Sequence, residues 1–210
     1  LIGSELLVFG AGLVAFLAVR IGDPAGFAHS ARELHRVAAG INTMALVTSG
    51  WLAALAVRRI GEGAIAAARR LLLGAALLGC IFLGVKAGEY AGLAARGLGM
   101  ESGAFFTFYY LLTGFHAAHV IAGIAVLGLV GWRPSHANAE TGIAFWHMVD
   151  MVWVLLFPVI YLLPRSCCAI RLPPHGWRWW RSAGQRRCWR CGQERRRARQ
   201  SCCWARSRRV

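Results

Sequence analysis

Five long apolar stretches are the feature of this sequence that most restricts its fold. They run from the start to about Val19, then from about Val37 to Val57, Leu71 to Leu93, Ala104 to Trp132 and Ile143 to Leu163. The hydrocarbon core of a bilayer is about 30 Å thick, and a helix crosses it with about 20 mainly apolar residues. No stretch shows the alternation of a barrel strand, and an open sheet edge cannot be satisfied in lipid. The predicted fold class is therefore all-α, an integral membrane bundle of five transmembrane helices.

The connectors between these stretches are short, with turn signals at Asp23-Pro24 and Arg133-Pro134. Successive helices are thus expected to be antiparallel neighbours in one domain. The second connector carries the densest basic cluster of this region, Arg58, Arg59, Arg69 and Arg70. The positive-inside rule places that connector in the cytoplasm, so the first helix starts in the cytoplasm and the last one ends in the periplasm.

Charge divides the chain into a body and a tail. Residues 1–164 hold nine Arg and one Lys against eight acidic residues, a net charge of +2. Residues 165–210 hold fourteen Arg against Glu194 alone, a net charge of +13, together with six of the seven cysteines. We therefore predict a transmembrane domain at residues 1–163 and a basic tail at 164–210. Because the chain opens at Leu1 without an initiating Met, we expect the first helix to lack its natural start.

The tail conflicts with the predicted orientation, because its arginines would have to cross the membrane. It is rich in Arg, Cys, Trp, Gly and Ser without apolar periodicity. This is the composition of a GC-rich message read out of frame, and our hypothesis is a frameshift product or a disordered segment, which the nucleotide sequence decides. Two alternatives are half a zinc site at Cys188 and Cys191, which lacks a second pair at that spacing, and binding to anionic lipid or nucleic acid. We expect no nucleic-acid partner.

Ionisable residues inside the apolar stretches need an explanation, since each costs roughly 2.5–3.5 kcal/mol on insertion scales. Lys86 and Glu89 are three residues apart on one face of the third helix, which predicts an internal ion pair. Gly84, Gly88 and Gly92 form a ridge of small residues on the same helix, which predicts close approach by another backbone. We therefore expect the third helix to be central in the bundle.

Histidines occupy the fourth and fifth helices. His116 and His119 are about one turn apart, as are His147 and Asp150. One interpretation is hydrogen bonding between the two helices, with neutral histidines and Asp150 as acceptor. The other is heme or copper ligation, since imidazole binds both. Histidines at i and i+3 cannot ligate opposite faces of one heme, and the body has no cysteine pair, so we predict neither metal ligands nor catalytic residues.

Glu5 lies early in the first stretch, and two positions are open to it. Its carboxylate either sits among lipid headgroups or is buried and faces a protein or lipid partner.

Together these polar residues resemble the subunit III family of the heme-copper oxidases, with one matching motif in each helix. The motifs are Ser4-Glu5; Asn42-Thr43 with Thr48-Ser49-Gly50; Glu89-Tyr90; Thr113-Gly114-Phe115-His116 with His119-Val120; and Trp146-His147 with Val149-Asp150. Each motif is weak alone, but their order is specific.

The resemblance implies a five-helix bundle that lacks the two extra N-terminal helices of longer members. It implies that Glu5 is a buried, carbodiimide-reactive carboxylate at a lipid or proton-related site, and that the other polar residues are structural. It further implies a chain without its own cofactor that packs against a catalytic subunit I, where heme and copper or iron reside, and that binds phospholipids. A multi-pass protein of the bacterial inner (plasma) membrane is expected.

The resemblance implies a non-catalytic subunit of a respiratory oxidase that supports aerobic electron transport. Lys86 and Leu156-Phe157-Pro158 are more similar to the NorE-type branch associated with nitric oxide reductase. An alternative from another class is an independent membrane redox protein that uses the intramembrane histidines. A transporter is disfavoured, because no helix is broken in mid-membrane and no inverted repeat is visible.

Overall fold

The computed structural model describes residues 2–162, and the predicted tail at 164–210 lies outside the described residues. The prediction of an all-α membrane bundle is confirmed, because the described part is helical and five of its helices are long and apolar enough to span a membrane. The helices are α1 (Ile2–Gly22), α2 (Pro24–Ser30), α3 (Arg36–Gly61), α4 (Ile65–Ala95), α5 (Ala104–Trp132) and α6 (His136–Phe157). A 3-10 turn, η1 (Ala31–Glu33), follows α2, and a π-helical turn, η2 (Pro158–Leu162), extends α6.

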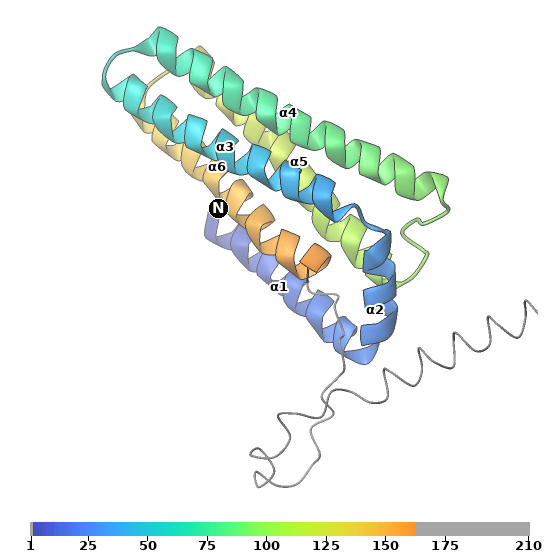
Figure 1. Ribbon diagram of the computed structural model, residues 1–210. Coiled ribbons are helices and arrows are strands. Elements are labelled where there is room, and N and C mark those ends of the chain that lie inside the picture. The colour runs from blue at the N-terminus through green and yellow to red at the C-terminus, as the bar shows by residue number, and fades with distance from the viewer. Residues whose placement is uncertain (1, 163–210) are drawn as a thin grey trace, which may run out of the picture. The chain divides into compact units, whose positions relative to one another are not determined.

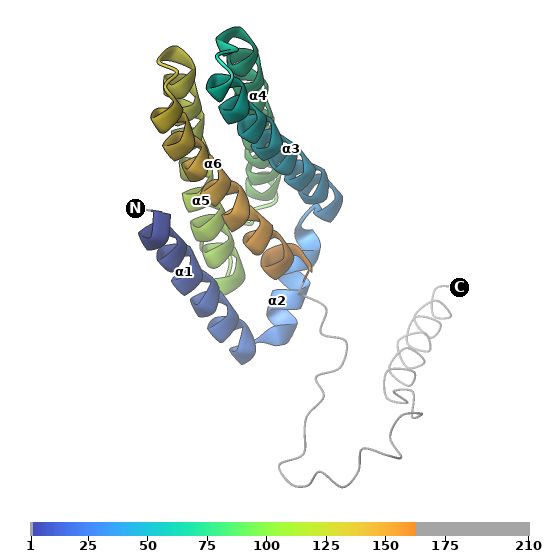
Figure 2. The same ribbon diagram turned by 90° about the vertical axis from the view of Figure 1, so that its left-hand side faces the viewer.

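Four of the spanning helices form a closed ring. Helix α3 packs against α4 and α6, and α5 packs against the same two helices, so α3 and α5 are diagonally opposed. Helix α1 lies outside this ring against α5 and α6, while α2 covers one end of the bundle beside α5. Figure 2 shows this arrangement, with the α3–α6 pair and the α1 helix on the near side.

The helices extend beyond the predicted apolar cores, because interfacial residues continue them. Helix α3 carries Arg58 and Arg59 in its last turn, where cations complement the helix dipole. The chain then reverses at Gly63, whose φ of 75° favours glycine. Helix α6 starts earlier than predicted, because the Ser135 hydroxyl caps it by accepting a hydrogen bond from the Asn138 amide at 3.3 Å.

Helix α2 was not predicted. The Asp23-Pro24 pair was interpreted only as a turn, whereas Asp23 caps a short helix by accepting a hydrogen bond from the Gly26 amide at 2.9 Å. Proline suits the first helical position, because its missing N–H is one that the helix does not use there. The same two residues therefore stop α1 and start α2.

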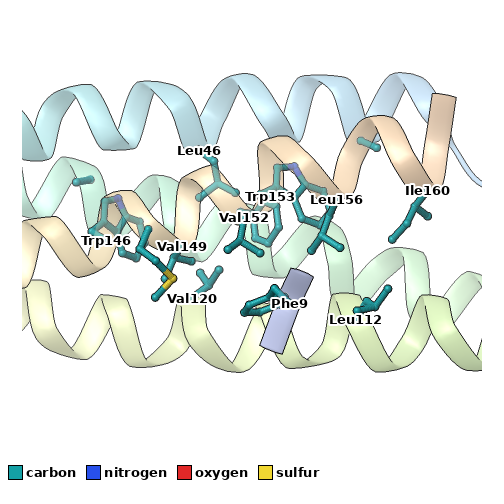
Figure 3. Packing of buried hydrophobic residues seen from close by; sticks show 14 of the residues in the cluster. Phe9, Leu46, Leu112, Val120, Trp146, Val149, Val152, Trp153, Leu156 and Ile160 are labelled. Carbon is teal, nitrogen blue, oxygen red and sulfur yellow. The ribbon is translucent and has the colours of Figure 1, made fainter. Parts of the chain in front are cut away.

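The core is built around α6. Half of the residues in the apolar window of α6 are buried, against 28% in that of α4. Figure 3 shows the buried side chains of α6 meeting those of α3, α5 and α1; the labelled residues are Phe9, Leu46, Leu112, Val120, Trp146, Val149, Val152, Trp153, Leu156 and Ile160. The prediction that the third spanning helix, α4, is central was therefore wrong.

The predicted glycine ridge on α4 has no neighbour in the bundle. A Cβ atom at Gly84, Gly88 or Gly92 would meet nothing within 4 Å. Close approach occurs instead at Gly79 of α4 and Gly123 of α5, where a Cβ would come within 2.9 Å and 2.5 Å of the Trp146 ring. The small residues that matter therefore accommodate a large indole rather than another backbone.

Candidate functional site

Lys86 is the centre of a buried polar cluster. Its ammonium donates hydrogen bonds to Glu89 Oε2 at 2.9 Å, to the Tyr109 hydroxyl at 2.9 Å and to the Tyr161 hydroxyl at 3.0 Å. The side chains of Lys86 and Glu89 are only 3% and 9% exposed. The ion pair expected from their spacing is thus present in the structure, and two phenols that the sequence reasoning did not include complete it.

Tyr161 reaches this cluster through η2. Pro158 lacks a backbone N–H, and the helix changes there from α to π geometry. The Tyr161 hydroxyl donates back to Glu89, at 3.1 Å from Oε1 and 3.0 Å from Oε2. A lysine ammonium has three donors, and all three are used here. The cluster therefore ties α4, α5 and η2 together and leaves no donor of Lys86 for a substrate.

Glu5 and His119 form a second polar pair, between α1 and α5. His119 Nε2 lies 3.0 Å from Glu5 Oε2, and His119 Nδ1 lies 2.9 Å from the Phe115 carbonyl. The carbonyl can only accept, so Nδ1 carries a proton. The contact with Glu5 then requires a further proton on Nε2 or on the carboxyl group. The pair is arranged to hold that proton, as imidazolium and carboxylate or as imidazole and carboxylic acid.

The depth of Glu5 follows from this contact. His119 is near the middle of α5, about 22 Å from Ala104 and about 20 Å from Trp132 at 1.5 Å per residue. Because Glu5 touches His119, its carboxylate lies level with the middle of α5 rather than with either end of that helix. Its side chain is 27% exposed and that of His119 is 15% exposed, so the pair lies just beneath the surface of the bundle.

The predicted hydrogen bonds between α5 and α6 are not formed by the histidines. His116 is fully buried, with its ring stacked on Trp153 at 5.1 Å and set edge-on to Phe82 at 5.6 Å. Neither ring nitrogen has a hydrogen-bond partner in the described part of the chain. His119 bonds to α1 instead of α6. The prediction was wrong because α6 presents an indole, not a polar group, to His116.

Tryptophan indoles make the polar contacts of α6 in place of the histidines. Trp153 Nε1 donates to Thr43 Oγ1 at 3.0 Å, and Trp146 Nε1 donates to Ser49 Oγ at 3.2 Å. Ser49 Oγ in turn donates to the Ala75 carbonyl at 2.8 Å, which connects α3 with α4. The family motifs included Thr43, Ser49 and Trp146, but sequence reasoning assigned them no contact. A tryptophan within an apolar run, whose N–H needs an acceptor, was the available signal.

His147 and Asp150 lie on the α3 side of α6. His147 Nδ1 is 4.0 Å from Asp150 Oδ2, too far for a hydrogen bond, and neither oxygen of Asp150 has a partner among the residues described. The carboxylate lies against the backbone of Gly50, where a Cβ atom would collide with Oδ2. Asp150 is thus not the acceptor that the sequence predicted.

The intramembrane histidines are therefore in three separate environments: an aromatic stack, a pair with Glu5, and a pair of residues facing α3. Within residues 2–162 no group of three His, Cys, Asp or Glu side chains is placed to hold a metal ion.

Comparison with known proteins shows which protein family this chain matches. The family profile described as cytochrome c oxidase subunit III matches residues 28–164, from within α2 to the start of the tail. Cytochrome c oxidase subunit 3 of Thermostichus vulcanus is 33% identical over 171 residues, covering 77% of this chain and 83% of that protein. Probable cytochrome c oxidase subunit 3 of Mycobacterium tuberculosis is 32% identical, with coverages of 77% and 84%. Heme-copper oxidase subunit I+III of Aeropyrum pernix is 32% identical over 177 residues, covering 77% of this chain and 22% of that protein.

Proposed function

The chain belongs to the cytochrome c oxidase subunit III family, and from this membership we propose that it is the non-catalytic membrane subunit of a respiratory heme-copper oxidase. In this role it packs against the catalytic subunit I and supports electron transport without a redox centre of its own. Heme and copper or iron belong to the partner subunit. The Aeropyrum pernix relative, named as subunit I+III, supports this partnership.

The observation that carries the proposal is how the polar side chains of the bundle are used. Lys86 uses its three donors in hydrogen bonds to Glu89, Tyr109 and Tyr161, and the indoles of α6 donate hydrogen bonds to side chains of α3. A metal site built from the intramembrane histidines would need them to converge on one point, whereas within residues 2–162 His116, His119 and His147 lie in separate environments. The residues thus suit a scaffold that fixes helix positions for a partner.

The oxidase branch is preferred to the NorE-type branch. The features that favoured NorE, Lys86 and the Leu-Phe-Pro sequence that ends at Pro158, belong to one structural unit. Pro158 begins the turn that carries Tyr161 to Lys86, where the two hydrogen-bond at 3.0 Å. Lys86 and the sequence that ends at Pro158 are thus explained by a structural role, the connection of α4, α5 and η2. The relatives reported above carry oxidase names, which favours the oxidase branch.

Glu5 and His119 are proposed as the lipid or proton-related site, because the pair holds a proton at mid-depth near the surface of α1 and α5. Phospholipids are the expected neighbours of this surface, in a bacterial inner (plasma) membrane. Glu5→Gln should preserve the shape of the pair and remove its acidic proton site. We expect assembly to persist and steady-state turnover of the complex to fall, which oxygen consumption by the purified complex would measure; unchanged turnover would rule out the proton-related role.

Copurification tests the function itself. The chain, carrying an affinity tag, is expressed with its catalytic subunit I and separately without it, and both preparations are examined by optical spectroscopy. We expect heme only in the preparation that contains subunit I, at a ratio of one tagged chain per catalytic subunit. A stoichiometric heme or copper signal in the isolated chain would favour the independent redox protein instead.

A further inference from the structure

The outward face between α3 and α6 combines apolar side chains with one polar position. Its exposed apolar residues are Met44, Val47 and Trp51 of α3 and Met151 and Val154 of α6. His147 lies beside them, with its side chain 45% exposed. The opposite face of the ring, between α4 and α5, exposes Leu73 and Leu77 of α4, side chains that suit lipid.

His147 is deep in the membrane. At 1.5 Å per residue it lies about 16 Å from His136 and about 22 Å from Leu162, the two ends of the spanning segment. Acyl chains offer no hydrogen bond at that depth, and ionisable residues in spanning helices almost always face protein or a water-filled cavity. A half-exposed imidazole at this position therefore indicates that protein covers the α3–α6 face.

Asp150 lies beside the imidazole of His147 without hydrogen-bonding to it. Its carboxylate is nine-tenths buried over Gly50, and His147 Nδ1 is the ionisable group beside it, at 4.0 Å from Oδ2. When a partner docks, a rotation of the ring would bring Nδ1–H within hydrogen-bond distance of Asp150. The hydrogen bond made by one ring nitrogen fixes the role of the other, so Nε2 would then be an acceptor available to the partner.

We propose that the α3–α6 face is the docking surface for the catalytic subunit, and that a transmembrane helix of that subunit donates a hydrogen bond to Nε2 of His147. Asp150 is a positioning residue that acts through His147. This inference rests on the proposed function, which supplies the partner. Lipid lacks a donor at this depth, and the fusion of subunits I and III in the Aeropyrum pernix relative favours subunit I over a second copy of this chain.

Photo-cross-linking tests the face without removing any contact. A photoreactive amino acid replaces Met151 on the proposed surface, and in a matched control it replaces Leu77 on the α4–α5 face, because both side chains are 62% exposed. In the intact complex we expect a cross-link to subunit I from position 151 and none from position 77. A cross-link from position 77 alone, from neither position, or from position 151 to a second copy of this chain would overturn the proposal.

Substitution of His147 tests the hydrogen bond. His147→Leu should lower the fraction of subunit I retained on the tagged chain after a detergent wash by about threefold to tenfold, the range given by interhelical hydrogen bonds in membranes. His147→Gln, which keeps an acceptor, should restore most of the retention, and Leu77→Gln should not alter it. Folding of each variant is checked by thermal unfolding of the isolated chain.

The result for the wild-type chain separates two failures. If wild type does not copurify with subunit I, the proposed function fails. If wild type copurifies and His147→Leu is retained equally well, the function stands and the docking inference is wrong.

Discussion

Lys86 and Arg59 each pair with a glutamate three residues on, at 2.9 Å and 2.8 Å, but in opposite surroundings. The first pair is almost fully buried, whereas Arg59 and Glu62 are 54% and 51% exposed. Removing one partner of a buried pair leaves an uncompensated charge and costs about 3–5 kcal/mol, while an exposed pair contributes about 0–1 kcal/mol. We predict that Lys86→Met destabilises the chain by about 3–5 kcal/mol and that Arg59→Met changes stability by less than about 1 kcal/mol.

Unfolding of the purified chain in mixed micelles measures both free energies. The double variant Lys86→Met with Glu89→Gln removes the orphaned charge and should recover part of the loss, giving a coupling energy in a double-mutant cycle. Equal effects of Lys86→Met and Arg59→Met would contradict the buried cluster.

Residue contacts were predictable only where they are local in sequence. The Lys86–Glu89 pair follows from i,i+3 spacing on one helix. Tyr109 and Tyr161, which join the same cluster, are 23 and 75 residues away from Lys86, and no helical spacing relates them to it. His116 is a second example, because the sequence of its own helix, α5, does not indicate which side chains of α6 will face it.

At the scale of the helix, alanine substitutions at Gly123 and Gly84 are predicted to have opposite effects on stability. A Cβ at Gly123 would come within 2.5 Å of the Trp146 ring, whereas a Cβ at Gly84 would meet nothing within 4 Å. Overpacking a core costs roughly 1–3 kcal/mol, and glycine in a helix interior costs about 1 kcal/mol relative to alanine. Gly123→Ala should therefore lower the thermal unfolding midpoint of the chain, and Gly84→Ala should leave it unchanged or raise it. A drop for both variants would contradict the packing of α6.

The spans were predictable, because bilayer thickness fixes how long an apolar helix must be. The contacts between the spanning helices were not predictable. Glycine spacing on α4 indicated a close contact, yet the glycines that admit Trp146 are Gly79 and Gly123, on two different helices. Predicting where a glycine makes such a gap requires knowing which large side chain fills it. The packing of the whole bundle determines that side chain, and the sequence of one helix does not.

At the scale of the molecule, the orientation in the membrane determines which ends of the helices face the cytoplasm, and therefore how the chain meets its partner. The α3–α4 connector around Glu62 and the segment around Glu101 lie at opposite ends of α4, a helix of 31 residues. Such a helix is about 46 Å long, enough to place its two ends on opposite sides of a bilayer. Arginines at positions 58, 59, 69 and 70 predict, by the positive-inside rule, that the first end lies in the cytoplasm.

Cysteine labelling in a variant without native cysteines tests this orientation. A membrane-impermeant maleimide added to intact spheroplasts should label Glu101→Cys and not Glu62→Cys, and inverted vesicles should give the reverse pattern. The fourteen arginines at residues 165–210 favour the opposite orientation, because basic residues that follow the last span can reverse a topology. The labelling pattern therefore decides between two sources of charge. Cytoplasmic Glu62 means that the connector arginines control insertion, and periplasmic Glu62 means that the tail overrides them.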